Sequence, residues 1–264
     1  MNHPDVWRSG EPYERYVGRW SRLVAPVFLA WLGVAEGQRW LDIGCGTGAL
    51  SSTILREAEP ADVFGVDPSP GFLAVAESHI TDARVRFMLG DAASIPLADG
   101  EVDVIVSGLM LNFVPAPALA LTEWQRIARP GATIAAYVWD YGDGMELMRA
   151  FWSAAIELDP GAEQYDEGRR FQSLCSPAGL AQLWERSGLR EVETRSIEVP
   201  TTFANFDDYW TPFLGGQGVA PAYVATLAPD HVETLREALA ESLPVASDGS
   251  IDLTARAWAV RGTR

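Results

Sequence analysis

Three glycines between a strand-like run and a helix-like run are the residues of this chain best placed for chemistry. Gly44, Gly46 and Gly48 follow the apolar run Leu41–Ile43, and a helical pattern follows them. Glycine lacks a Cβ and adopts positive φ angles without strain, so a ligand can approach the backbone of such a turn closely. The first N–H groups of the new helix have no partner within the helix and can bond that ligand. The spacing therefore predicts a turn that lies under a cofactor.

Carboxylates at the ends of three successive predicted strands indicate which kind of cofactor this turn holds. Asp42 lies two residues before Gly44, where a negative charge is a poor neighbour for a pyrophosphate but suits a group carrying an ammonium and a sulfonium. Asp67 ends the second predicted strand, where a carboxylate can accept hydrogen bonds from both hydroxyls of a ribose. Asp91 and Ala92 follow the third and offer an acceptor-rich turn to an adenine edge.

Two other interpretations of the same turn stay open. The spacing Gly44-x-Gly46-x-x-Ala49 also satisfies the dinucleotide fingerprint, in which Asp67 grips the ribose of NAD. That pattern alone would describe an NAD-dependent oxidoreductase. A binding protein that kept the cofactor turn and lost its acceptor site is the third interpretation.

A parallel α/β sheet is the fold expected to position these residues. Short runs rich in Val, Ile or Phe predict strands at 39–43, 62–67, 84–89, 102–107 and 132–139. Helical patterns lie at 48–58, 70–81 and 116–129, and one or two helices are expected within 11–34.

The second half of the chain continues this pattern with longer interruptions. Ser176 followed by Pro177 marks a helix start, as Ser69 and Pro70 do earlier, because serine caps a helix and proline suits its first position. Two further strands fit 190–199 and 251–261. The aromatic-rich segments 142–175 and 201–247 are expected to be helical insertions that form a lid over an apolar acceptor pocket.

The combined segments resemble the class I S-adenosylmethionine-dependent methyltransferases. Within that family the chain is similar to the small-molecule branch related to the ubiquinone and menaquinone C-methyltransferases. The resemblance covers about residues 38–140. It rests on five segments: Leu41–Gly48, Gly65–Ser69, Gly90–Ala92, Val102–Ser107 and Arg129–Gly131.

The resemblance implies a Rossmann-like sheet of seven strands in the order 3-2-1-4-5-7-6, mostly parallel, with the seventh strand antiparallel and helices on both faces. It implies that residues 38–141 form the core that binds S-adenosylmethionine. Residues 1–37 would supply helices that close over this cofactor. Residues 142–264 would hold the remaining strands and the lid, and S-adenosylhomocysteine would be the product.

The resemblance also assigns roles to individual residues. The glycine turn, with Cys45 inside it as a small packing residue, would underlie the methionine moiety, and Asp42 would assist its ammonium. Asp67, followed by Pro68, would take the ribose, and Asp91 with Ala92 the adenine. The remaining assignments are Ser107 and Leu109 near the donor sulfur, and Tyr16, Arg19 and Trp20 on the closing N-terminal segment, with Arg19 toward the methionine carboxylate.

Methyl transfer from a sulfonium is an in-line displacement that needs alignment of donor and acceptor and exclusion of water, and it needs neither a metal nor a covalent intermediate. A base is required only where the acceptor must lose a proton. Asp140 and Tyr141, directly after the fifth predicted strand, are the candidates for a base or an acceptor-orienting group. Whether carbon, oxygen or nitrogen receives the methyl group stays open.

Composition limits the kinds of partner, the chance of a metal site and the compartment that we expect for the protein. The net charge of −16, with no Lys among the 20 basic residues, argues against a nucleic acid as the principal partner. Two cysteines and three histidines make a metal site improbable and fit a reducing compartment. With no apolar leader and no membrane-spanning run, we expect a cytoplasmic protein that acts on a small organic molecule, as a monomer or a homodimer.

Overall fold

The computed structural model describes residues 18–215 and 218–264, and Tyr16 lies outside them. The chain divides into two compact units. The sheet unit comprises residues 21–138, 174–197 and 257–264. The helical unit comprises, of the described residues, 18–20, 139–173 and most of 198–256. Each unit is described by itself.

Seven strands form one sheet in the order β3-β2-β1-β4-β5-β7-β6. Neighbours among β1 to β5 pair in parallel. β7 runs antiparallel to β5, because Gly131 donates to the carbonyl of Arg264 and Arg264 donates to that of Ala132. The strand bounds are β1 Arg39–Ile43, β2 Asp62–Asp67, β3 Val85–Leu89, β4 Val102–Gly108, β5 Ala128–Trp139, β6 Arg190–Phe203 and β7 Ile251–Thr263.

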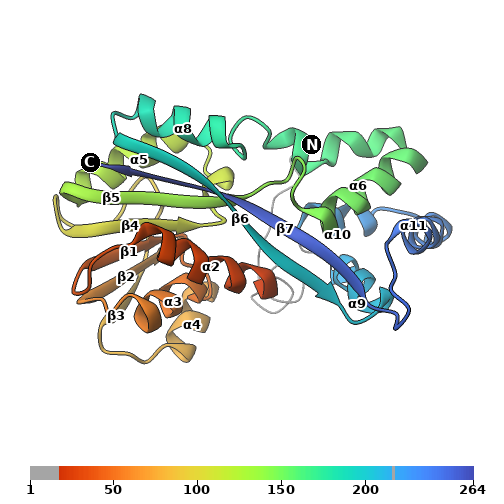
Figure 1. Ribbon diagram of the computed structural model, residues 1–264, viewed down its shortest axis with the longest axis horizontal. Helices are drawn as coiled ribbons and strands as arrows, with labels where there is room; N and C mark the ends of the chain where they lie inside the picture. Colours follow the sequence, from red (N-terminus) through yellow and green to blue (C-terminus); the bar gives the residue numbers. More distant parts are fainter. Residues whose placement is uncertain (1–17, 216–217) are drawn as a thin grey trace. The chain divides into compact units, whose positions relative to one another are not determined.

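The central strands are buried along almost their whole length. In β1, β2 and β4 nearly every residue is shielded from solvent, which is the pattern of a parallel sheet covered on both faces. In Figure 1, α5 and α8 lie together along one side of the strands, away from α2, α3 and α4. Their bounds are α2 Arg19–Leu32, α3 Ala49–Glu57, α4 Pro70–His79, α5 Pro117–Ile127 and α8 Pro177–Arg186.

Two helices begin as the sequence predicts. The Ser69 hydroxyl accepts a hydrogen bond from the backbone of Phe72 at 3.3 Å, and Pro70 occupies the first turn of α4. The Ser176 hydroxyl accepts one from Gly179 at 3.1 Å at the start of α8. Each cap satisfies one N–H that the helix itself leaves unpaired.

The helical unit is built around aromatic side chains from short elements. Phe151 stacks on Phe213 with ring centroids 4.5 Å apart, and Trp152 lies 5.7 Å from Tyr223. The elements are α6 Glu146–Leu158, η3 Pro160–Tyr165, α7 Glu167–Arg170, α9 Phe206–Trp210, η4 Thr211–Gly215, α10 Val219–Val224 and α11 Pro229–Ser242. The two predicted insertions therefore fold into one unit, and its action as a lid stays a prediction.

The fold class, the strand order and the seven strand positions are confirmed. β5, however, begins at Ala128, four residues before the predicted start at 132, because Ala128 pairs with Val102 across a register shift. Such an irregularity accommodates Pro130 and Gly131 inside a strand. β6 also extends past 199, through Pro200, which an edge strand tolerates because its N–H side need not pair.

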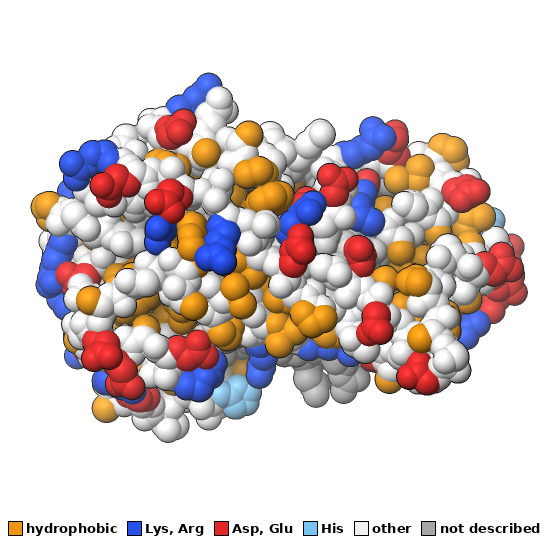
Figure 2. Space-filling model, viewed as in Figure 1, with side chains coloured by type: hydrophobic (Ala, Val, Ile, Leu, Met, Phe, Trp, Pro, Cys, Tyr) orange, Lys and Arg blue, Asp and Glu red, His pale blue; other side chains and the backbone are white. Residues whose placement is uncertain are grey.

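Within residues 18–215 and 218–264, no helix has the length and apolar character needed to cross a membrane. Figure 2 shows acidic and basic side chains interspersed over the face in view. Ion pairs of partly exposed arginines with exposed acids include Arg126 with Asp99 and Arg236 with Asp207.

Candidate functional site

The three glycines of the turn between β1 and α3 all have positive φ, at +70° for Gly44, +53° for Gly46 and +86° for Gly48, but their surroundings differ. A Cβ on Gly44 would lie 2.5 Å from Cγ of Met110, and one on Gly48 would lie 2.6 Å from Cδ1 of Ile80. A Cβ on Gly46 would meet nothing within 4 Å. Gly44 and Gly48 thus admit neighbouring side chains, and Gly46 is the glycine whose outer side is open to a ligand.

Asp67, at the end of β2, accepts a hydrogen bond from this turn. One carboxylate oxygen accepts a hydrogen bond from the backbone of Gly46 at 2.9 Å, and the other accepts one from Ser69 at 2.8 Å. Burial raises the pKa of the Asp67 carboxyl, against the lowering effect of these two bonds. The structure therefore brings Asp67 to the open glycine, while Pro68 beside it is exposed.

Asp42 faces the first turn of α3. Its side chain is 1% exposed and accepts a hydrogen bond from the Ser51 hydroxyl at 2.6 Å. Burial raises the pKa of the Asp42 carboxyl to about 7, and the charge of Asp67 adds to this rise. The site therefore holds a carboxylate that readily changes its charge near neutral pH. Cys45 is buried beside both acids, which raises the pKa of its thiol and keeps it neutral, as suits a packing residue.

The turn after β3 carries the residues expected at the adenine. Asp91 is exposed, and its carboxylate accepts a hydrogen bond from Ala93 at 2.9 Å. Ala92 is buried, and its carbonyl accepts a hydrogen bond from the indole N–H of Trp124 at 3.0 Å. This hydrogen bond attaches the turn to α5 and fixes the orientation of the Ala92 carbonyl.

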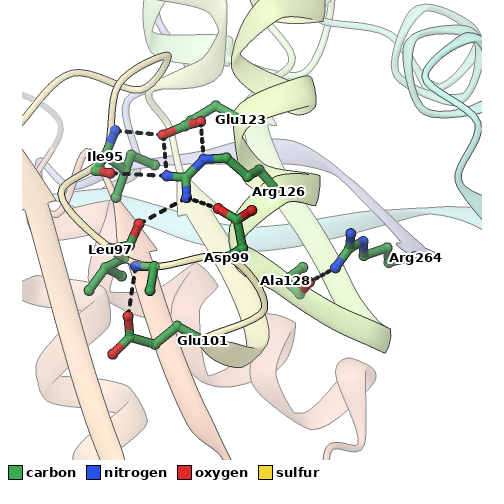
Figure 3. A network of polar contacts seen from close by, with 9 residues as sticks. Ile95, Leu97, Asp99, Glu101, Glu123, Arg126, Ala128 and Arg264 are labelled. Carbon is green, nitrogen blue, oxygen red and sulfur yellow. Dashed lines mark hydrogen bonds and ion pairs between the residues drawn. The ribbon is translucent and has the colours of Figure 1, made fainter.

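A polar network from α5 anchors the rest of the same loop (Figure 3). Arg126 donates to the carbonyls of Ile95 and Leu97, and it pairs with Asp99 at 2.6 Å. Glu123 accepts from the backbone of Ile95 at 2.8 Å and from Arg126 at 2.8 Å. The loop between β3 and β4 is therefore held at several backbone atoms by one helix.

The segment that follows β4 lies beside the glycine turn. Ser107 is fully buried and its hydroxyl has no hydrogen-bond partner. Leu109 has a φ of +60°, an uncommon conformation for a side chain of its shape, and its N–H bonds the carbonyl of Tyr137 at 2.8 Å. Met110 then packs against Gly44, so the structure brings this segment beside the turn.

Sequence reasoning missed Asn112, which lies in η2, Leu111–Phe113, directly after this segment. Its side chain is 8% exposed, and neither its amide nitrogen nor its amide oxygen has a partner. A single amide within the apolar run Leu109–Val114 was the signal that could have identified it.

The other candidates belong to the helical unit. The Arg19 guanidinium lies 4.3 Å from the ring of Trp20 and 4.8 Å from that of Phe203, and it pairs with Asp208 at 3.0 Å. Trp20 is 8% exposed. The predicted roles of Arg19 and Trp20 over the cofactor stay predictions, and that of Tyr16 falls outside the described residues.

Asp140 holds the turn that follows β5. Its carboxylate pairs with Arg256 at 2.6 Å and accepts a hydrogen bond from the backbone of Asp143 at 3.2 Å. Tyr141 is buried, with its ring 5.5 Å from that of Phe171. Their proposed catalytic roles stay predictions.

A buried acid in the helical unit was also missed by sequence reasoning. Glu167 begins α7, is 4% exposed, and accepts a hydrogen bond from the Trp152 indole. Burial raises the pKa of the Glu167 carboxyl to about 7. The adjacent Asp166 instead pairs with Arg149. Nothing in the local sequence separates these two neighbouring acids. In the part of the chain that the structure describes, no cluster of acidic, histidine or cysteine side chains could hold a metal ion.

The sequence is similar to those of known methyltransferases. Residues 41–136 match the family described as "Methyltransferase domain". The chain is 30% identical, over 69% of its length, to 2-methyl-6-phytyl-1,4-hydroquinone methyltransferase of Synechocystis sp.. It is 27% identical, over 67% of its length, to demethylmenaquinone methyltransferase of Lactiplantibacillus plantarum. The match spans 56% of the first relative's length and 81% of the second's.

Solved structures share the fold. One is described as a putative methyltransferase from an antibiotic biosynthesis pathway of Anabaena variabilis, with a TM-score of 0.62, 20% identity, and 92% of this chain and 97% of that one covered. Another is phosphoethanolamine N-methyltransferase 2 of Haemonchus contortus in complex with S-adenosyl-L-methionine, with a TM-score of 0.56 and 18% identity. That match covers 90% of this chain and 51% of the other.

Proposed function

Since residues 41–136 are a methyltransferase domain, we propose that the protein transfers a methyl group from S-adenosylmethionine to a small, apolar or aromatic organic acceptor. S-adenosylhomocysteine is the second product. The reaction is an in-line displacement in which the acceptor attacks the methyl carbon as the carbon–sulfur bond breaks and its electron pair returns to sulfur.

The observation that carries this proposal is the open side of Gly46 next to the carboxylate of Asp67. The glycine turn leaves room above Gly46 for a ligand, since a Cβ there would meet nothing within 4 Å. Asp67 borders this space with oxygens that suit the hydroxyls of a ribose. Asp67, and Asp42 when it is ionised, place negative charge beside the turn, which favours a cationic group over a pyrophosphate. The residues present therefore fit S-adenosylmethionine.

The chain's own residues have three tasks in this reaction. The turn at Gly44–Gly48 and Asp67 would bind and orient the donor, while Asp91 and Ala92 would receive the adenine. Ser107 and Leu109 would border the donor sulfur. Holding the acceptor at about 3–3.5 Å from the methyl carbon accounts for most of the catalysis.

The names of the relatives support this acceptor class. The relatives named above act, by their names, on a hydroquinone and on demethylmenaquinone. The aromatic side chains of the helical unit pack on one another in its core. We place this unit as a lid that excludes water and the segment 1–37 as a further cover, with Arg19 and Trp20 toward the cofactor. Asp140 would shape the turn that presents Tyr141 to the acceptor.

A transfer assay tests this function. The full chain is incubated with S-adenosylmethionine labelled in its methyl group and with a panel of hydroquinones, phenols and aromatic amines. We expect label in at least one hydroquinone or phenol, and S-adenosylhomocysteine in equal amount. Tight binding of S-adenosylhomocysteine with no transfer to any member would favour a binding protein without an acceptor site.

A further inference from the structure

The amide of Asn112 is a buried polar group without a partner. Of the residues that the structure describes, it is the one side-chain amide whose nitrogen and oxygen are both buried and unpaired. Leaving a buried polar atom unpaired destabilises the folded protein, and most buried polar groups in proteins have partners. An amide with two such atoms is therefore expected to meet its partner in a ligand.

The position of Asn112 points to a ligand at the transfer site. Asn112 follows the carboxyl end of β4, and ligands of open parallel sheets bind outside this edge. The segment before it is held from two sides, because Leu109 bonds the carbonyl of Tyr137 and Met110 packs against Gly44. The amide is thus fixed within a short turn beside the glycine loop.

The chemistry of the amide narrows the class of ligand. It offers N–H donors and an acceptor oxygen side by side, which matches a hydroxyl group that both accepts and donates. A carboxylate would use only the donor and would leave the amide oxygen unpaired. An ammonium would use only the acceptor and would leave the amide nitrogen unpaired.

We propose that Asn112 binds a hydroxyl group on the aromatic ring of the methyl acceptor, so that the substrates are phenols or hydroquinones. The amide nitrogen donates to the hydroxyl oxygen, and the amide oxygen accepts the hydroxyl hydrogen. This inference rests on the proposed methyl transfer and specifies its acceptor.

Replacing Asn112 with leucine separates this role from a structural one. Leucine has nearly the same size and removes both unpaired polar atoms, so Asn112→Leu should leave the melting temperature unchanged or raise it. Affinity for S-adenosylhomocysteine should stay within about twofold of wild type. The control is Asn205→Ala, which removes the cap that accepts a bond from Asp208 at 2.9 Å and should lower only the melting temperature.

The decisive readout is binding of acceptor analogues to the complex with S-adenosylhomocysteine. Calorimetry under anaerobic conditions compares 2-methylhydroquinone and 1,4-dihydroxynaphthalene with their dimethyl ethers. Wild type and Asn205→Ala should prefer at least one diol over its ether by about tenfold. Asn112→Leu, and Asn112→Ala as a second variant, should reduce this preference to less than about twofold.

Three results would overturn the assignment of Asn112. They are an unchanged diol preference in both variants, a fall in the melting temperature of Asn112→Leu, and a wild-type complex that binds neither diol. In each case binding of S-adenosylhomocysteine would leave the proposed function standing. Failure of the wild type to bind S-adenosylhomocysteine would instead remove the proposed function, and this inference with it.

Discussion

Two carboxyls, those of Asp42 and Glu167, are buried, and burial raises the pKa of each so that its charge changes near neutral pH. Each has its pKa raised to about 7, mainly because the interior disfavours the charged form. Asp42 lies beside the glycine turn, and Glu167 lies among the aromatic residues of the helical unit. Ser51 and Asp67 act on the carboxyl of Asp42, whereas Trp152, Asp166 and Arg170 act on that of Glu167.

Glu167 makes the stability of the protein depend on pH. Its pKa rises from 4.5 in the unfolded chain to about 7 in the folded one, so the folded state holds the extra proton between these values. Stability therefore falls as the pH rises from about 4.5 to 7, and the loss is complete above about pH 7. A shift of this size corresponds to about 3 kcal/mol.

Glu167→Gln tests this prediction. Glutamine stays neutral and can still accept the hydrogen bond from Trp152. The variant should match wild type at pH 4 and be more stable at pH 8, as measured by chemical denaturation at both values. Glu157→Gln, at an exposed position of α6, is the matched control and should follow wild type. Equal slopes with pH in Glu167→Gln and wild type would show that Glu167 ionises normally.

At the scale of elements, α5 determines the shape of the loop that is expected to receive the adenine. Trp124 and Trp184 form a natural comparison, because both are fully buried and each donates its indole N–H to a backbone carbonyl at 3.0 Å. Trp124 bonds Ala92 in the loop, and Trp184 bonds Ile134 in the middle of β5.

Trp124→Phe should therefore weaken binding of S-adenosylhomocysteine by about tenfold, the equivalent of one hydrogen bond of positioning. Trp184→Phe should lower the melting temperature as much as Trp124→Phe does, but it should leave the affinity for S-adenosylhomocysteine unchanged. Both measurements are made by calorimetry and thermal unfolding on the same preparations. Equal losses of affinity in the two variants would mean that α5 supports the fold without a particular effect on the adenine loop.

The elements also show what local sequence determines. The positions of β1 and β2 and the caps at Ser69 and Ser176 follow from patterns a few residues long, and the sequence predicts them correctly. The early start of β5 depends on its pairing with Val102, which lies on another strand, so local patterns miss it.

At the scale of the whole molecule, the methyltransferase domain and its strand order were predictable because several short segments agree with one topology. The partners and the burial of particular site residues could not be predicted from the sequence. Asp140 is held by Arg256, which lies 116 positions away, and Arg19 by Asp208, at 189 positions. The unpaired amide of Asn112 and the burial of Glu167 are likewise visible only in the folded structure.

The central claim is that the space above Gly46 holds the methyl donor, and Gly46→Asn tests it. Asparagine tolerates the φ of +53° at this position and places a side chain in the open space. Gly100→Asn is the control, because Gly100 has a φ of +64° and equally open surroundings on another loop.

Calorimetry with S-adenosylhomocysteine and with NAD on these three proteins is the most direct measurement. We expect wild type and Gly100→Asn to bind S-adenosylhomocysteine and not NAD, and Gly46→Asn to lose at least about 100-fold in affinity, or nearly 3 kcal/mol, with an unchanged melting temperature. Binding of NAD alone by the wild type, or undiminished affinity for S-adenosylhomocysteine in Gly46→Asn, would contradict this account.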